Sequence, residues 1–234
     1  MPEVIEHIKG YQSNEQRNLL LKIFSYEFSR NNLFLTGGTA LSVFYATHRT
    51  SKDIDLFLIK EVNLLEYVRL LKDIGRVLTT ISESTTFCSY IYEGGIKVDY
   101  VFDRFSASGN KKAAVIDGIT INVDTVENIA INKICAVVSR AEPKDIIDLT
   151  WLFLNVFNPE RDFIQLFNKA TKREGLLEDL LYVKGVFNHI RQRSESILEV
   201  IHKALLQAFN YLQISEVFGF LEGLIDKLIK KKSA

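Results

Sequence analysis

Two aspartates in one short segment have the residue type and spacing to do chemistry. Asp53 and Asp55 lie two positions apart in the run Asp-Ile-Asp-Leu-Phe-Leu. In a strand this spacing puts both carboxylates on one face, with Ile54 and Leu56 on the opposite, core-facing side. Neighbouring carboxylates repel each other unless a cation lies between them, and hard oxygen ligands suit Mg²⁺ or Mn²⁺. The spacing therefore predicts a divalent-metal site.

A pair of glycines precedes these aspartates. Gly37 and Gly38 follow a short apolar run and open a predicted helix over 39–47. Glycines at a helix start allow close backbone approach and offer free N–H groups at a positive helix end, which suits phosphate. Thr39 is expected to cap this helix and to donate to a phosphate oxygen. Glycines and aspartates together predict a metal-dependent site for a nucleoside triphosphate.

The elements that must position these residues change in character near residue 150. Before it, strand-like segments alternate with helices, and after it the pattern is nearly all helical. The sequence predicts an α+β fold: a core over 1–150 with a small mixed sheet flanked by helices, and an α-helical C-terminal bundle over 151–234. The predicted strands are 34–36, 54–59, 77–81, 86–92, 96–102 and 116–121, and the predicted helices of the core include 14–30, 39–47 and 64–75.

The ordered string around the aspartates resembles a known motif. It is similar to the first motif of the DNA-polymerase-β-like nucleotidyltransferases, and most similar to the AbiEii/AbiGii toxin family of minimal nucleotidyltransferases. A glycine turn followed by two surface aspartates would leave the glycine pair and the apolar flanks unexplained. His48 and Arg49 either contact phosphate or nucleic acid or orient the turn. The matching residues are Gly37, Gly38, Thr39, Ala40, Leu41, His48, Arg49, Ser51, Asp53 and Asp55.

Lys97 and Asp99 form a second candidate element. Strand alternation puts both on one face of the predicted strand 96–102. The resemblance implies that Asp99 is the third carboxylate of a two-metal site with Asp53 and Asp55, with Lys97 partly neutralising the cluster. In such a site one metal positions the attacking hydroxyl and the other clamps the triphosphate. Taken alone, Lys97 and Asp99 would be a surface ion pair.

A later segment places two cations on one predicted helix. Asp124 and Glu127 have the spacing of a capping box that opens this helix. Lys133 and Arg140 then lie seven residues apart, on one stripe of a largely apolar helix. A triphosphate would explain cations on such a helix.

The same segment resembles a second motif of the AbiEii family. The resemblance implies that Lys133 is a phosphate-binding or catalytic lysine, supported by Arg140 and Asp148. The alternative is an ion pair between Arg140 and Asp145 or Asp148 that ties two helices. The matching residues are Ala130, Lys133, Ala136, Arg140, Lys144, Asp145, Asp148 and Leu149.

The resemblance also implies a reaction and partners. The expected activity is transfer of a nucleoside monophosphate from an NTP to an acceptor, with release of pyrophosphate. The expected acceptor is RNA such as a tRNA end, and the expected setting is a toxin–antitoxin or phage-defence system with a cognate antitoxin protein. Beyond about residue 155 no family motif matches, and a basic stretch over 169–193 either grips the RNA or is a solvated helix face. Two alternatives remain open: a nucleotidyltransferase that modifies small molecules such as antibiotics, and a nucleotide-binding regulatory protein without turnover.

Composition sets broad limits on these expectations. Lys plus Arg and Asp plus Glu each number 29, so any nucleic-acid surface must be a local patch. Cys88 and Cys135 lie in apolar surroundings without metal-like spacing, which predicts buried reduced thiols and a cytoplasmic protein. The charged N-terminus and the lack of a long apolar run predict neither a signal peptide nor a membrane span.

Overall fold

The computed structural model describes residues 5–232 and divides into two compact units, Met1–Asn128 and Ile129–Ala234. The division falls near the start of helix α6 (Val126–Ser139), earlier than the change at residue 150 that the sequence indicates. The reason is packing. α6 contacts α8 (Pro159–Thr171), and α7 (Pro143–Asn155) packs against later helices, so both helices belong with the C-terminal bundle.

The first unit is built on a seven-stranded sheet with the order β3-β4-β5-β2-β1-β7-β6. β1 runs parallel to β7 and β2 runs parallel to β5, while the other neighbours are antiparallel, so the sheet is mixed as predicted. The strands are β1 (Leu33–Thr36), β2 (Ile54–Leu58), β3 (Val77–Glu83), β4 (Phe87–Tyr92), β5 (Ile96–Val101), β6 (Lys111–Ile116) and β7 (Ile119–Asp124).

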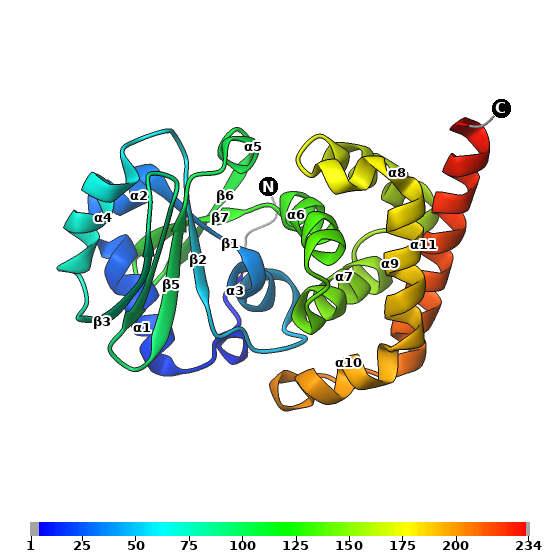
Figure 1. Cartoon of the computed structure of the whole chain (residues 1–234). Coiled ribbons are helices and arrows are strands. Elements are labelled where there is room, and N and C mark those ends of the chain that lie inside the picture. The colour runs from blue at the N-terminus through cyan, green and yellow to red at the C-terminus, as the bar shows by residue number, and fades with distance from the viewer. Residues whose placement is uncertain (1–4, 233–234) are drawn as a thin grey trace. The chain divides into compact units, whose positions relative to one another are not determined.

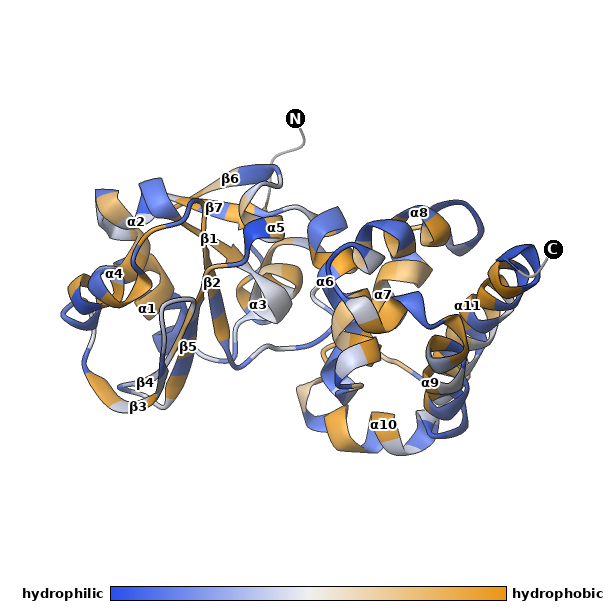
Figure 2. Cartoon of the chain, turned by 45° about the horizontal axis from the view of Figure 1, so that its top comes forward, coloured by the Kyte–Doolittle hydropathy of each residue, from blue (hydrophilic) through white to orange (hydrophobic). Residues whose placement is uncertain are grey.

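Helices cover this sheet and bury its apolar strands. All four residues of β1 are buried, and the central strands are coloured mainly as hydrophobic in Figure 2. α1, α2 and α4 lie together on one side of the sheet, whereas α3 packs on β1 and β2 (Figure 1). The helical elements are η1 (Ile8–Gly10), α1 (Asn14–Ser25), α2 (Glu27–Asn32), α3 (Gly37–Leu41), the π-helical η2 (Ser42–Ala46), α4 (Leu64–Lys72) and α5 (Arg104–Ala107).

The second unit is entirely helical within the described residues, as predicted. α9 and α11 lie side by side, and the hydrophobic and hydrophilic colours alternate along both helices, as expected for amphipathic helices (Figures 1 and 2). Phe163, Phe187 and Phe218 stack their rings edge to face or tilted in the bundle core. The helices beyond α8 are η3 (Gly175–Glu178), α9 (Leu180–Gln192), α10 (Ser194–Ile201), η4 (His202–Ala204) and α11 (Tyr211–Lys232).

Two predicted elements differ from the structure. The helix predicted over 14–30 is two helices that break at Tyr26, whose extended backbone ends α1 and precedes α2. The strand predicted over 116–121 is a hairpin, because Asp117 and Gly118 both have positive φ (49° and 76°) and reverse the chain between β6 and β7. An Asp-Gly pair is a strong signal for this turn.

The structure also bears on the expectations about the cysteines and about membrane spans. Cys88 is buried, Cys135 is partly exposed, and both are free thiols. None of the helices in residues 5–232 combines the length and the apolar character that a membrane span needs.

Candidate nucleotide and metal site

Neighbouring strand ends bring the predicted carboxylates side by side. Thr36, at the end of β1, is paired with Asp55 on β2, and Asp55 is paired with Asp99 on β5. Paired residues on adjacent strands are about 5 Å apart and project to the same face. Asp53 lies directly before β2, and Ile54 between the two aspartates is fully buried. Asp99 therefore comes from the strand beside Asp55, as the resemblance implied.

Asp99 is held by two neighbours. Its Oδ2 lies 2.5 Å from Lys97 Nζ, and its Oδ1 accepts a 2.6 Å hydrogen bond from the Ser89 hydroxyl. Burial lowers the pKa of Lys97, but the hydrogen bond to Asp99 and the charges of Asp99, Asp53 and Asp55 outweigh burial, so the pKa is raised. Lys97 therefore stays protonated and offsets part of the negative charge of Asp99. A nucleotide-binding role of Lys97 stays a prediction.

Gly37 lies against the Asp55 carboxylate. Its backbone has a φ of 67°, in the left-handed region that favours glycine. A Cβ built at Gly37 would overlap Asp55 Oδ2 and lie 2.8 Å from Asp55 Cγ. The turn therefore needs glycine for two independent reasons, its φ angle and the space taken by Asp55.

The rest of the glycine turn is fixed by buried polar side chains. A Cβ at Gly38 would lie 2.8 Å from both an Arg49 Nη and the Ser51 Oγ. Arg49 is buried and donates to the Thr50 carbonyl at 2.9 Å, and His48 is fully buried. These positions favour the interpretation that His48 and Arg49 orient the turn.

Thr39 does not cap helix α3. The N-cap position is Thr36, and the Thr39 hydroxyl is buried and donates to the backbone carbonyl of Asp53. Thr39 therefore links α3 to the residue that begins the aspartate motif. A contact between Thr39 and a nucleotide stays a prediction.

No group of three or more His, Cys, Asp or Glu side chains within residues 5–232 is arranged to hold a metal ion. The paired Asp55 and Asp99 still fit Mg²⁺, because this ion is usually held by one or two carboxylates together with substrate phosphates and water. The metal-ligand roles of Asp53, Asp55 and Asp99 stay predictions.

Asp124 is a buried carboxylate that ties this region together. It ends β7, and its Oδ2 accepts hydrogen bonds from the Thr36 hydroxyl (2.7 Å) and the Asn128 side chain (2.6 Å), while Oδ1 accepts from Thr125 N (2.9 Å). Burial raises the pKa of Asp124, although these hydrogen bonds and the charge of Lys111 oppose the shift. Asp124 therefore anchors the strand end that leads into Gly37.

This anchor replaces the predicted capping box. Asn128 N donates to the Thr125 hydroxyl at 3.2 Å, so Thr125 takes the capping role predicted for Asp124 and Glu127. The sequence analysis missed the contact between Asp124 and Thr36. Its signal was a polar residue at the end of each of two apolar runs, since parallel neighbours bring such ends together.

The second unit contains a separate buried ion network. Lys133 Nζ lies 2.7 Å from Asp145 Oδ1 and 2.8 Å from Asp148 Oδ2, and Arg140 Nε lies 2.7 Å from Asp145 Oδ2. The side chains of both aspartates are fully buried, Lys133 is 8% exposed and Arg140 is 51% exposed. The network joins α6 to α7, as the structural alternative for Arg140 and Asp145 foresaw.

The cations in this network lower the pKa of Asp145. Burial raises the pKa of Asp145, but the charge of Lys133 and the hydrogen bonds from Arg140 and Lys133 outweigh burial, so the pKa lies below its ordinary value. Asp145 is therefore ionised at neutral pH. The nucleotide-binding roles of Lys133, Arg140 and Asp148 stay predictions.

Solved structures share this fold. A protein of H. pylori described as a nucleotidyltransferase superposes with a TM-score of 0.55 at 20% identity, over 94% of this chain and 98% of that one. JHP933 from Helicobacter pylori gives 0.52 at 21% identity, over 94% and 96%. MenT4, a nucleotidyltransferase toxin from Mycobacterium tuberculosis, gives 0.53 at 16% identity, over 89% and 84%.

Sequence comparison gives the family. No curated protein matches the chain. The family model described as "Nucleotidyl transferase AbiEii toxin, Type IV TA system" matches residues 18–218, which include the glycine turn, all three aspartates and the ion network around Lys133. The chain therefore belongs to the AbiEii nucleotidyltransferase toxin family and is a nucleotidyltransferase.

Proposed function

We propose that this enzyme uses a divalent metal to transfer a nucleoside monophosphate from an NTP to RNA, with release of pyrophosphate. The observation that carries this proposal is the pairing of Asp55 with Asp99 beside Gly37. This arrangement offers carboxylates for a cation and a glycine turn for phosphate on one edge of the sheet.

Mg²⁺ or Mn²⁺ is the metal that suits this donor set. Asp53, Asp55 and Asp99 would hold it, and when bound it would orient the attacking hydroxyl and stabilise charge on the phosphates. Lys97 already neutralises one side of Asp99, which lowers the cost of holding the carboxylates together before metal and nucleotide arrive.

The glycine turn would take the triphosphate. Gly37 is partly exposed and lies close to Asp55, while Thr39 and Asp124 fix the two ends of the turn. Lys133 and Arg140, with Asp148 orienting Lys133, would add positive charge for the phosphates. Of these, Arg140 has the most exposed side chain, so it can contact a ligand without leaving the ion network.

The proposed acceptor is RNA, such as a tRNA end, and the proposed biological role is that of a toxin controlled by a cognate antitoxin. Family membership supports the toxin role. Exposed cations on the helical unit, among them Lys172 and Arg193, support binding to a phosphate backbone.

The test is an incubation of the enzyme with each radiolabelled NTP, Mg²⁺ and separate pools of total RNA, protein or antibiotics. Label in RNA is the expected result. Label only in an antibiotic would favour a small-molecule enzyme, and NTP binding without label in any pool would favour a regulatory protein. The Asp55→Asn variant is the control, because the proposal requires that it transfers no label.

A further inference from the structure

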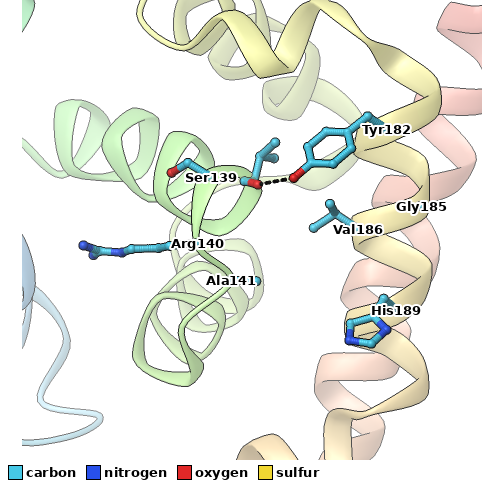
Figure 3. Close-up of a pocket in the computed structure, with 8 residues that line it drawn as sticks. Ser139, Arg140, Ala141, Tyr182, Gly185, Val186 and His189 are labelled. Atoms are coloured by element: carbon cyan, nitrogen blue, oxygen red, sulfur yellow. Dashed lines mark hydrogen bonds between the residues drawn. The ribbon is translucent and has the colours of Figure 1, made fainter.

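One stripe of α9 faces a cavity in the helical unit. Tyr182, Val186 and His189 follow one another at i, i+4 and i+7, so they lie along one side of the helix, and Arg193 directly follows α9. The first three line a cavity of about 400 Å³, opposite the turn over 139–141 that ends α6. Figure 3 shows Tyr182, Val186 and His189 pointing from α9 toward that turn.

Gly185 leaves the wall of this cavity open. It lies within α9, where glycine is the least favourable helix residue after proline. A Cβ at Gly185 would meet no atom within 4 Å, so packing does not require a glycine. Its consequence is free space on the helix between the Tyr182 ring and the His189 ring.

The opposite wall is the end of α6 and the turn after it. The last carbonyls of a helix lack partners within the helix and carry partial negative charge. At the end of α6, the Tyr182 hydroxyl donates to the Val138 carbonyl at 3.3 Å, which fixes the ring at the edge of the cavity. The Arg140 side chain points away from α9 in Figure 3. The Tyr182 ring is therefore held in place at the cavity.

The cations of α9 divide between two faces. Lys184 Nζ lies 2.6 Å from Asp226 and Arg191 Nη2 lies 3.5 Å from Glu222, and both carboxylates are on α11. Arg193, directly after α9, instead lies next to the stripe, with Nη1 3.5 Å from His189 Nε2. Alternating aromatic rings and cations are what single-stranded nucleic acid needs, because bases stack on the rings and phosphates contact the cations.

We propose that this cavity binds one unpaired base of the RNA acceptor, stacked on Tyr182 in the space beside Gly185, with the adjoining phosphate at Arg193. This inference rests on the proposed RNA acceptor and names where the helical unit reads it. Base stacking tolerates any sequence, so the cavity serves affinity and placement of the strand.

The experiment measures binding of a fluorescein-labelled RNA hairpin that ends in one unpaired nucleotide to the full chain by anisotropy, over a series of salt concentrations. We expect Tyr182→Ala and Gly185→Leu to weaken binding about five- to a hundredfold. Tyr182→Phe keeps the ring and should bind within about twofold of wild type, since stacking dominates. Gly223→Leu is the matched control, because Gly223 is also an exposed glycine within a helix and lies outside this cavity.

Two further measurements separate stacking from charge. The slope of log affinity against log salt should be the same for Tyr182→Ala and wild type, because no phosphate contact is lost. A second RNA with an abasic site at its unpaired end should bind wild type and Tyr182→Ala equally. Thermal melting of each variant establishes that it is folded.

The inference is overturned if Tyr182→Ala weakens binding of the intact and abasic RNA by the same factor. It is also overturned if Gly185→Leu binds RNA like Gly223→Leu. In both cases, label transferred from NTP to RNA by wild type would leave the proposed function standing. Wild type that neither binds nor labels RNA would remove the proposed RNA acceptor, and the base site with it.

Discussion

The backbone of Gly37 and the carboxylate of Asp55 adjoin so closely that a Cβ at Gly37 would lie 2.8 Å from Asp55 Cγ. This contact joins the two halves of the AbiEii motif, the glycine turn and the aspartate strand. It follows from the antiparallel pairing of β1 with β2, which sets Thr36 opposite Asp55 and leaves Gly37 just past the strand end.

Gly37→Ala should abolish transfer, because the new Cβ displaces the Asp55 carboxylate. Gly118→Ala is the matched control: Gly118 also has positive φ, but a Cβ there meets no atom within 4 Å. Gly118→Ala should lower the free energy of unfolding by about 1–2 kcal/mol, the cost of left-handed backbone at a non-glycine residue, and Gly37→Ala should lower it by more, because the overlap with Asp55 adds to that cost. Turnover and urea unfolding of both variants check this, and equal loss of turnover in the two would remove the Asp55 explanation.

Asp53→Asn, Asp55→Asn and Asp99→Asn should each lower turnover at least about a thousandfold, because each removes a charge proposed to hold the metal. Without metal, the melting temperatures of the Asp53→Asn and Asp55→Asn variants should equal or exceed that of wild type, since carboxylate repulsion is relieved. Asp117→Asn is the control, because Asp117 lies in the hairpin turn between β6 and β7. Wild-type turnover in the Asp53→Asn/Asp55→Asn double variant would exclude the metal site.

The sequence predicted the strands of the site more accurately than their surroundings. The limits of β4 and β5 match the predictions closely, because turn signals border their apolar runs. The strand predicted over 116–121 spans the turn between β6 and β7, because the alternating pattern on either side of Asp117 and Gly118 is weak. Apolar periodicity in the first helix continues across Tyr26, so the pattern alone hides the break there.

Partners of buried charges were the least predictable feature. The sequence placed Lys133 and Arg140 on one stripe, yet it left open whether the aspartates of the next helix pair with them. Asp124 and Thr36 are 88 residues apart, and only the parallel pairing of β1 with β7 brings them together. Such contacts depend on sheet order, which local patterns do not encode.

Lys133→Ala should lower the free energy of unfolding at pH 7 by about 3–5 kcal/mol, because it leaves two buried aspartates without their lysine. This deficit should shrink as pH falls toward 4. In wild type the pKa of Asp145 is below its ordinary value, so its stabilisation is complete above about pH 4 and is lost at lower pH. In the variant, Asp145 stays buried, which raises its pKa, and it no longer has the charge of Lys133, which lowered its pKa. Proton uptake by Asp145 at mildly acidic pH therefore reduces the cost of burying its charge.

Urea unfolding at pH 7 and pH 4 measures the deficit. Lys144→Ala is the control, because Lys144 forms an ion pair with Glu142 at the surface, with 3.3 Å between Nζ and Oε2. This substitution should lower the free energy of unfolding by less than about 1 kcal/mol at either pH. Turnover is measured on the same samples, with Lys133→Arg to restore the charge. A deficit that stays constant between the two pH values would show that the aspartates are not the cause.

RNA binding should depend on some cations of the helical unit and not on others. Lys172→Gln and Arg193→Gln should each flatten the slope of log affinity against log salt by about 0.7, the value for one phosphate contact on a single strand. Lys184→Gln and Arg191→Gln should change the slope much less, because their partners Asp226 and Glu222 already neutralise them.

Reversing charge at Lys172, Arg173 and Arg191 together should weaken RNA binding and spare NTP binding. Equal slope changes at all four single positions would mean that RNA displaces the α11 carboxylates, and no change at any position would exclude this surface.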